Sequence, residues 1–210
     1  MTQSQPAPRP PRFQSASFDV VALAASAGGL QALSKILAEL PADFPAATVI
    51  VQHLDPRHRS LMAEIFSRRT SLKVKEAEEG DRLLPGGVFT APPNRHLLVN
   101  PDGTLSLSQS ELVHFVRPSA DLLFESVAAS YKDRAIAVVL TGTGEDASMG
   151  LRAIKKMGGT TVVQDEKTAE FFGMPAAAIA TGAVDFVLPL DEIPHALVSL
   201  VMGEPRPADG

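Results

Sequence analysis

Three residues that could share one reaction each follow a separate apolar segment of the chain. Ser26 follows VVALAA, His53 follows TVIVQ, and Asp146 lies in TGTGED directly after AIAVVL. A serine hydroxyl becomes an effective nucleophile when an imidazole takes its proton and a carboxylate orients that imidazole. A triad is defined by geometry and role, so the order Ser, His, Asp along the chain is compatible with one. These residue types predict a serine hydrolase.

Each of the three residues also has an ordinary structural interpretation. Ser26 could simply cap the helix expected near Leu30, because serine is a preferred N-cap residue. Asp146 stands at the expected N-cap of a helix that begins at Ala147, a position that aspartate favours for structural reasons. His53 could be a hydrogen-bonded histidine that closes a strand. The residues alone leave these alternatives open.

Other side chains compete for the same roles. Glu145 could be the functional acid in place of Asp146. His58 competes as the base, although it lies in the polar stretch Pro-Arg-His-Arg. None of the remaining histidines follows a long apolar segment; they are His96, His114 and His195.

The backbone after the serine could stabilise negative charge. Small residues surround Ser26 in AASAGG, and they let a strand turn sharply into a helix. The N–H groups of Ala27 and Gly28 are then expected near the helix N-terminus, where a developing oxyanion is favoured.

The sequence lacks a phosphate-binding G-x-x-x-x-G-K-[ST] loop and the H-E-x-x-H spacing of a metal site. We therefore expect no metal.

The elements that would position these residues alternate along the chain. Short apolar runs predict buried strands, and amphipathic patterns between them predict helices. The expected strands are 19–25, 48–52, 135–140, 160–164 and 184–188, and the expected helices are about 30–40, from 60, about 147–157 and 191–202. This alternation indicates a parallel sheet covered on both faces. Because loops at the carboxyl ends of such strands converge over one crevice, the three candidate residues should meet there.

The middle of the chain departs from this alternation. Residues 81–108 carry Gly-Gly, Pro-Pro and Asp-Gly turn signals around the short extended pieces VFTA, HLLV and LSLS. Such a pattern predicts an antiparallel β-hairpin inserted into the sheet. The expected fold class is α/β, doubly wound and mostly parallel, with one inserted antiparallel hairpin.

Composition limits the class of protein further. The chain of 210 residues is 45% apolar, which suffices for one domain with a packed core. A net charge of -5 argues against nucleic-acid binding, and no segment is apolar enough for membrane insertion. The absence of cysteine fits a cytoplasmic protein. We expect a disordered tail over 1–17, a catalytic domain over 18–202 and a flexible tail over 203–210.

Several motifs together resemble the catalytic domain of the chemotaxis receptor protein-glutamate methylesterases, the CheB family. The similarity spans nearly all of residues 18–202, and the motifs occur in order at family-like spacing. They are A-S-A-G-G at Ser26, V-Q-H-L at His53, E-E-G-D-R-L-L-P-G-G-V-F-T-A-P-P from Glu78, R-P-S-A-D from Arg117, L-T-G-T-G-E-D from Leu140, Q-D-E from Gln164, G-M-P from Gly173 and G-A-V-D from Gly182.

The resemblance implies that Ser26 attacks a receptor glutamyl methyl ester, with His53 as base and then acid and with Asp146 orienting the imidazole. An acyl-enzyme forms, methanol leaves, and water releases the glutamate. It also implies deamidation of receptor glutamines by the same chemistry, and no cofactor. The implied partner is a methylated chemoreceptor or another signalling protein. Two alternatives stay open for regulation: constitutive activity, or gating by a separate response-regulator protein.

Four residues differ from those usual in the family. Ala24 and Ala147 stand where the family commonly has glycine, Ala27 stands for threonine, and Thr143 stands for a methionine associated with the oxyanion pocket. Family members also commonly begin with a receiver domain, whereas 17 residues precede Phe18 here. We therefore expect a stand-alone catalytic domain. Two other hypotheses remain: a low-activity regulatory or binding module, and a hydrolase for another ester or amide.

Overall fold

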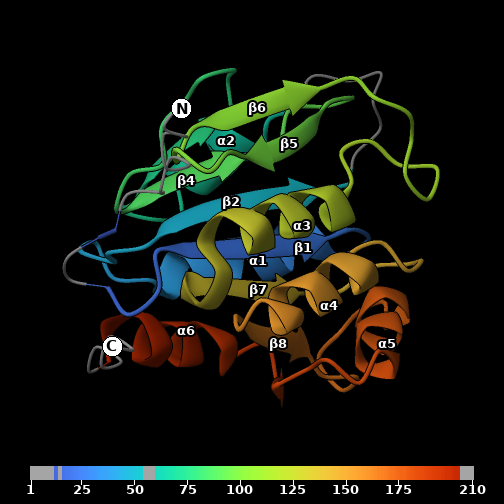
Figure 1. The fold of residues 1–210 in the computed structure, drawn as a ribbon. Helices are drawn as coiled ribbons and strands as arrows, with labels where there is room; N and C mark the ends of the chain where they lie inside the picture. The colour runs from blue at the N-terminus through green and yellow to red at the C-terminus, as the bar shows by residue number, and fades with distance from the viewer. Residues whose placement is uncertain (1–11, 14–15, 54–59, 204–210) are drawn as a thin grey trace, which may run out of the picture.

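A seven-stranded sheet runs through the centre of the molecule (Figure 1). The computed structural model describes residues 12–13, 16–53 and 60–203. The strand order is β3-β4-β2-β1-β7-β8-β9, and all six pairings are parallel. The strands are β1 (Val20–Ala25), β2 (Ala47–Gln52), β3 (Lys73–Glu76), β4 (Gly87–Thr90), β7 (Ala135–Val139), β8 (Thr160–Gln164) and β9 (Phe186–Leu188).

Helices cover both faces of this sheet. In Figure 1, α3 and α4 lie in front of the central strands and α1 lies behind them. The helices are α1 (Gly29–Glu39), α2 (Met62–Ser67), α3 (Ala120–Tyr131), α4 (Ser148–Lys156), α5 (Gly173–Ala180) and α6 (Ile193–Met202), with a short 3-10 turn at Lys132–Arg134. This arrangement confirms the predicted doubly wound α/β class.

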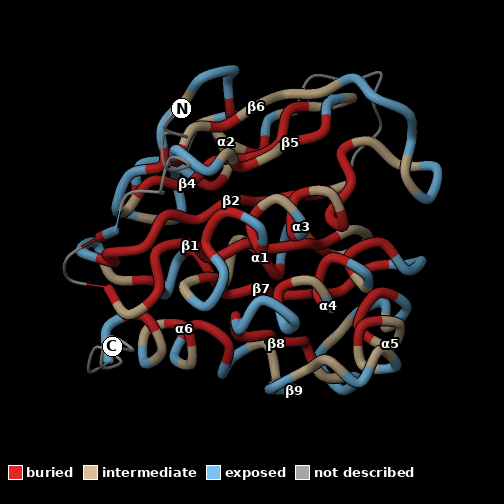
Figure 2. The backbone as a smooth tube through the Cα atoms, viewed as in Figure 1, coloured by how far each residue is buried: buried red, intermediate tan, exposed pale blue. Residues whose placement is uncertain are grey.

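The central strands are buried along their whole length, as Figure 2 shows. Every residue of β1, β2, β7 and β8 is buried, because helices on both faces exclude water from either side of each strand. The edge strand β3 has the sequence KVKE and was not predicted, because it carries no apolar run. Charged residues at a sheet edge oppose pairing with another chain.

The predicted hairpin exists, but it is not part of the main sheet. Strands β5 (His96–Val99) and β6 (Leu105–Ser108) pair antiparallel in a sheet of their own. The first extended piece, VFTA, instead contributes β4, which pairs in parallel with β2 and β3. The buried β4 sits between two neighbours, so its environment matches the other parallel strands.

The predicted helices near 30–40, from 60, near 147–157 and at 191–202 are observed as α1, α2, α4 and α6. Two further helices, α3 and α5, were not predicted. In α5 (GMPAAAIA) the apolar residues are not confined to one stripe, so the periodic signal is weak. The omission of α3 matters most, because its first turn contacts the candidate site.

The segment before β1 lies against the last helix. The Ser17 N–H donates to the Val201 carbonyl oxygen over 2.9 Å, and the Ser17 hydroxyl donates to the Gly203 carbonyl oxygen over 3.0 Å. Phe13 and Ala16 are buried, so part of the segment predicted as a tail packs against the domain. The rest of the two predicted tails, residues 1–11, 14–15 and 204–210, lies outside the described residues. Within the described ranges, no helix has the length and apolar character needed to cross a bilayer.

Candidate active site

The sheet brings the three candidate residues to one edge. Ala25 and Gln52 are register partners at the ends of β1 and β2, so Ser26 and His53 follow neighbouring strands. The His53 N–H extends this ladder by donating to the Ala25 carbonyl oxygen over 3.1 Å. Asp146 lies in the loop after β7, which borders β1 on its other side. All three therefore lie beyond the carboxyl ends of adjacent parallel strands.

The candidate base and acid are in direct contact. His53 Nε2 lies 2.8 Å from Asp146 Oδ2, with side chains 13% and 4% exposed. The same carboxylate accepts three more hydrogen bonds, from the Ser119 hydroxyl at 2.8 Å, the Ala120 N–H at 2.6 Å and the Asp121 N–H at 3.1 Å. Four donors thus hold a buried negative charge at the first turn of α3, where the helix dipole also favours it.

Asp146 does not cap the helix that follows it, so that structural alternative is wrong. The N-cap of α4 is Ala147, and the carboxylate of Asp146 is bound to α3 instead. Burial by itself raises the pKa of Asp146, but the hydrogen bonds from His53, the Ala120 N–H and Ser119 outweigh it and leave the pKa below the ordinary value. A carboxylate that stays ionised can orient and stabilise a protonated imidazole.

The contact with Asp146 selects the tautomer of the neutral imidazole. With Nε2–H donating to the carboxylate, Nδ1 of His53 carries the lone pair that can accept a proton. Among the described residues, neither Nδ1 nor the Ser26 hydroxyl has a hydrogen-bond partner, and none joins them to each other. In the absence of substrate, hydrogen bonds in active sites are often long and close only in the complex.

Ser26 is not a helix cap. Gly28 occupies the N-cap position of α1 with φ 76°, and no side chain bonds to the first turn. The N–H groups of Ala27 and Gly28, at the start of α1, have no acceptor among the described residues. That these two N–H groups bind an oxyanion stays a prediction. Thr143, the third residue assigned to this region, is exposed in the loop after β7.

Two glutamines that end buried strands hold the surrounding backbone by hydrogen bonds, and the sequence predicts a role for neither. The Gln52 amide, at the end of β2, donates to the Ser26 carbonyl oxygen at 2.7 Å and to the His53 carbonyl oxygen at 3.0 Å. At the end of β8, Gln164 Oε1 accepts the Thr141 N–H at 2.8 Å. Gln52 is only 5% exposed, so it ties the candidate nucleophile to the candidate base within the protein interior.

Glycines allow the loops to approach one another closely. A Cβ on Gly142 would lie 2.8 Å from the Ser26 Cβ and 2.4 Å from the Met174 sulfur. A Cβ on Gly29 would lie 2.0 Å from Gln52 Oε1. All three distances are shorter than a Cβ tolerates, so Gly29 and Gly142 allow these close approaches because they have no side chain.

His96 acts on Asp146 indirectly, because it binds Ser119, which in turn binds the carboxylate. The sequence did not predict this role. His96 is fully buried, with Nδ1 accepting the Ser119 N–H at 3.0 Å and Nε2 lying 3.0 Å from the Glu111 carbonyl oxygen. Because one nitrogen accepts and the other donates, the ring is neutral. The quoted motif R-P-S-A-D contains Ser119, and it is the signal that could have identified this support.

The competing candidates lie elsewhere. Glu145 is 70% exposed and lies 3.4 Å from His114 Nδ1. His195 is exposed on α6, and His58 lies outside the described residues. The part of the chain that the structure describes contains no group of three His, Asp or Glu side chains arranged to hold a metal.

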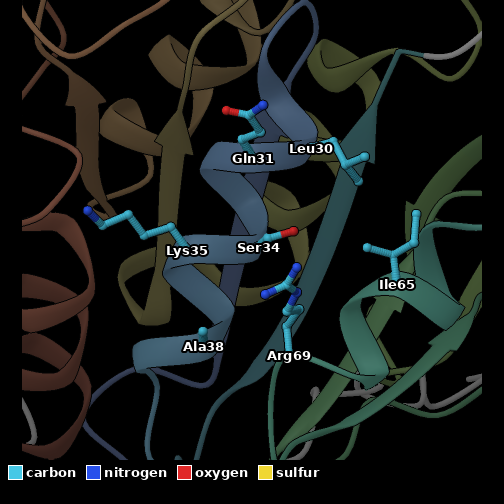
Figure 3. Close-up of a pocket in the computed structure, with 7 residues that line it drawn as sticks. All are labelled: Leu30, Gln31, Ser34, Lys35, Ala38, Ile65 and Arg69. Carbon is cyan, nitrogen blue, oxygen red and sulfur yellow. The ribbon is translucent and has the colours of Figure 1, made fainter.

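Two grooves of about 400 Å³ each open on the surface. One lies between α1 and α2, and Figure 3 shows Leu30 and Ile65 projecting into the space between them. Its lining contains no imidazole or carboxylate, so it offers no acid–base chemistry: Leu30, Gln31, Ser34, Lys35, Ala38, Ile65 and Arg69. The other lies between α4 and α5 and is lined in part by His114 and Glu145.

Three comparisons with known proteins point to one family. The profile of the CheB methylesterase family matches residues 21–197. A protein of Leptospira interrogans, provisionally named a protein-glutamate methylesterase/protein-glutamine glutaminase, is 42% identical over 88% of this chain and 95% of its own length. Protein-glutamate methylesterase/protein-glutamine glutaminase 2 of Anaeromyxobacter dehalogenans is 45% identical over 89% of this chain and 54% of its own length.

A solved structure shows the same fold. The crystal structure of the Thermotoga maritima CheB methylesterase catalytic domain superposes with a TM-score of 0.84 at 38% sequence identity, over 88% of this chain and 99% of that domain. The family profile, the relatives and the fold lead to one conclusion. The chain belongs to the CheB methylesterase family.

Proposed function

We propose that this protein hydrolyses glutamyl methyl esters on a methylated chemoreceptor or a related signalling protein, and deamidates glutamines by the same chemistry. The observation that carries the proposal is the part-buried His53–Asp146 pair, which lies at the sheet edge beside Ser26. Family membership supports the substrate class, because the named relatives are protein-glutamate methylesterases and glutaminases.

In the first half of the reaction, Ser26 Oγ attacks the γ-carbonyl carbon of the ester while His53 Nδ1 accepts the hydroxyl proton. The carbonyl oxygen becomes an oxyanion that the N–H groups of Ala27 and Gly28 can bind. Asp146, held ionised by its four donors, stabilises the imidazolium. Collapse of the tetrahedral intermediate breaks the bond to the methoxy oxygen, His53 returns the proton, and methanol leaves.

In the second half, water attacks the acyl-enzyme and gives its proton to His53. The intermediate collapses to glutamate and free Ser26, which regains its proton from the imidazole. When the substrate is glutamine, ammonia leaves in place of methanol and the second half is unchanged. No step requires a cofactor. Residues 18–202 would form the catalytic domain, and a substrate on the intracellular part of a receptor would place the enzyme in the cytoplasm.

The test uses receptor membranes carrying radiolabelled methyl esters. The wild type should release labelled methanol, and Ser26→Ala should lower the rate by several orders of magnitude because nucleophile and base act as a unit. Ser34→Ala is the matched control, since Ser34 lies on α1 in the groove without acid–base groups. Undiminished release by Ser26→Ala would reject the mechanism. A wild type that binds the receptor without turnover would instead favour a regulatory module.

A further inference from the structure

A two-residue turn near the candidate site carries unusual residues. Val113 and Val116 exchange both backbone hydrogen bonds, at 3.2 and 2.9 Å, so His114 and Phe115 form the tip of a minimal hairpin. Both tip residues have positive φ, 49° and 64°. Turns of this kind favour Asn-Gly, because side chains such as phenylalanine are strained there. We call residues 113–116 the tip turn.

The aromatic residue at this tip faces water. Phe115 is 94% exposed, more than any other large apolar residue described, and Leu112 beside it is 54% exposed. Two features of Phe115 lower the stability of the folded state. Its backbone conformation is strained, and its apolar ring stays exposed to water. Strain of this sort clusters at sites of function.

The tip turn is fixed to the catalytic carboxylate through its histidine. His114 Nε2 lies 3.1 Å from Asp121 Oδ2, and the Asp121 N–H donates to Asp146 Oδ1 over 3.1 Å. His114 Nδ1 also lies 3.4 Å from Glu145, the residue before Asp146. In Figure 1, the loop after β6 extends on the side to which the arrows of β1 and β2 point, which is the side of the active site.

An apolar groove opens directly beside the tip turn. It has a volume of about 400 Å³, and its mostly apolar floor joins Met149 of α4 to small residues of α5. Met149 is 51% exposed. His114 belongs to both features, so the tip turn borders the groove. The lining residues are His114, Glu145, Ser148, Met149, Ala177, Ala180 and Thr181.

We propose that the tip turn and this groove dock the protein substrate beside its esterified glutamate. The inference rests on the proposed function and adds the means by which a polypeptide, rather than a small ester, is recognised. The occupant is the substrate segment next to the scissile ester: its aliphatic side chains enter the groove and cover the Phe115 ring. Proximity favours this occupant: two successive contacts join the tip turn to Asp146, so a protein bound over the site lies close to this surface.

The experiment compares two substrates. One is the methylated cytoplasmic fragment of a chemoreceptor, and the other is the γ-methyl ester of an N-acetylglutamate amide, which lacks the flanking residues of a polypeptide. Phe115→Ala should lower kcat/KM on the receptor fragment about tenfold, through KM, as expected for loss of an aromatic anchor. Its hydrolysis of the small ester should stay unchanged. Phe115→Tyr should restore most of the loss.

Two further variants separate docking from other effects. Leu84→Ala removes another exposed apolar residue, 58% exposed and outside this groove, and should leave both substrates unaffected. Phe115→Gly suits the positive φ yet lacks the ring, so it should fold at least as well as the wild type and still show the raised KM.

The outcomes distinguish the inference from the function. Equal losses on both substrates, or no loss on the receptor fragment, would overturn docking by Phe115 while leaving the esterase intact. A wild-type dimer that Phe115→Ala dissociates, with no change in KM, would assign the surface to a second copy of the chain and overturn it too. A wild type inactive on the receptor fragment would overturn the proposed function and this inference together.

Discussion

The hydroxyl of Ser119 donates to Oδ1 of Asp146 over 2.8 Å, so the residue that caps α3 also binds the candidate catalytic acid. The Ser119 N–H is in turn held by His96. Because α3 packs closely against α4, which follows the Asp146 loop, the orientation of the carboxylate depends on elements far apart in the sequence.

We predict that Ser119→Ala lowers kcat with little change in KM. A hydrogen bond to a buried charged group contributes about 1.5–3 kcal/mol, which corresponds to about ten- to hundredfold in rate if the acid loses its orientation. Loss of the cap should also cost about 1 kcal/mol of stability. Steady-state kinetics and thermal unfolding measure the two effects. Ser119→Thr keeps the hydroxyl and should recover most of the activity; an equally inactive threonine variant would contradict the role of the hydroxyl.

Gln52→Glu tests the clamp between Ser26 and His53. The substitution keeps the shape but replaces the amide donor with an oxygen that repels both carbonyl oxygens. Activity on a small ester should fall at least about tenfold, since two bonds that fix the nucleophile and the base are lost. Gln164→Glu is the comparison: there the oxygen that accepts the Thr141 N–H is kept. A Gln52→Glu enzyme as active as the Gln164→Glu enzyme would show that the clamp has no catalytic consequence.

Ala147→Gly should stabilise the protein. Ala147 is one of the four departures from the family, and it adopts φ 91°, a conformation that costs a residue with a Cβ about 1 kcal/mol or more. Relief of this strain should raise Tm by about 2–4 °C in a chain of this length. Thermal unfolding provides the measurement, with Ala24→Gly as the control. Ala24 lies inside β1 and is fully buried, so glycine there should destabilise. A fall in Tm for Ala147→Gly would contradict the claim that the backbone at Ala147 is strained.

Asp121→Asn should change how stability depends on pH. Burial raises the pKa of Asp121, the charge of Asp146 raises it further, and contacts with the Gly150 N–H and His114 only partly oppose this. The folded state therefore binds this proton more tightly than the unfolded chain, and ionisation of Asp121 weakens the wild type as the pH rises above the ordinary value of 3.8. Asparagine cannot ionise, so the Tm of the variant relative to the wild type should increase from pH 3.8 up to the raised folded pKa of Asp121 and stay constant above it. A Tm difference between Asp121→Asn and the wild type that does not grow with pH would contradict a raised pKa for Asp121.

The sequence predicted the parts of this molecule that depend on local pattern. Continuous apolar runs located β1, β2, β7 and β8, and the parallel-sheet rule placed Ser26, His53 and Asp146 at one edge, with His53 and Asp146 in contact. Whether the hydroxyl of Ser26 meets the imidazole during catalysis stays a prediction. The sequence pattern did not predict strand β3, because its stability comes from pairing with β4 rather than from apolar side chains.

The support of the site could not be predicted in the same way. The roles of Gln52, His96 and Ser119 arise from hydrogen bonds across long chain separations, which residue type and periodicity do not encode. Asp146 shows the difficulty well. Its place before a helix favoured a cap on α4, whereas tertiary packing turned the carboxylate toward a different helix.

The bonds from Ser17 to Val201 and Gly203 place the two borders of the domain beside each other, next to the amino end of β1. A short peptide could therefore join these borders, and new termini could be opened elsewhere, to give circular permutants of the same enzyme. Fluorescent or affinity modules fused at either border would sit at the end of β1 away from Ser26, leaving access for large substrates unobstructed.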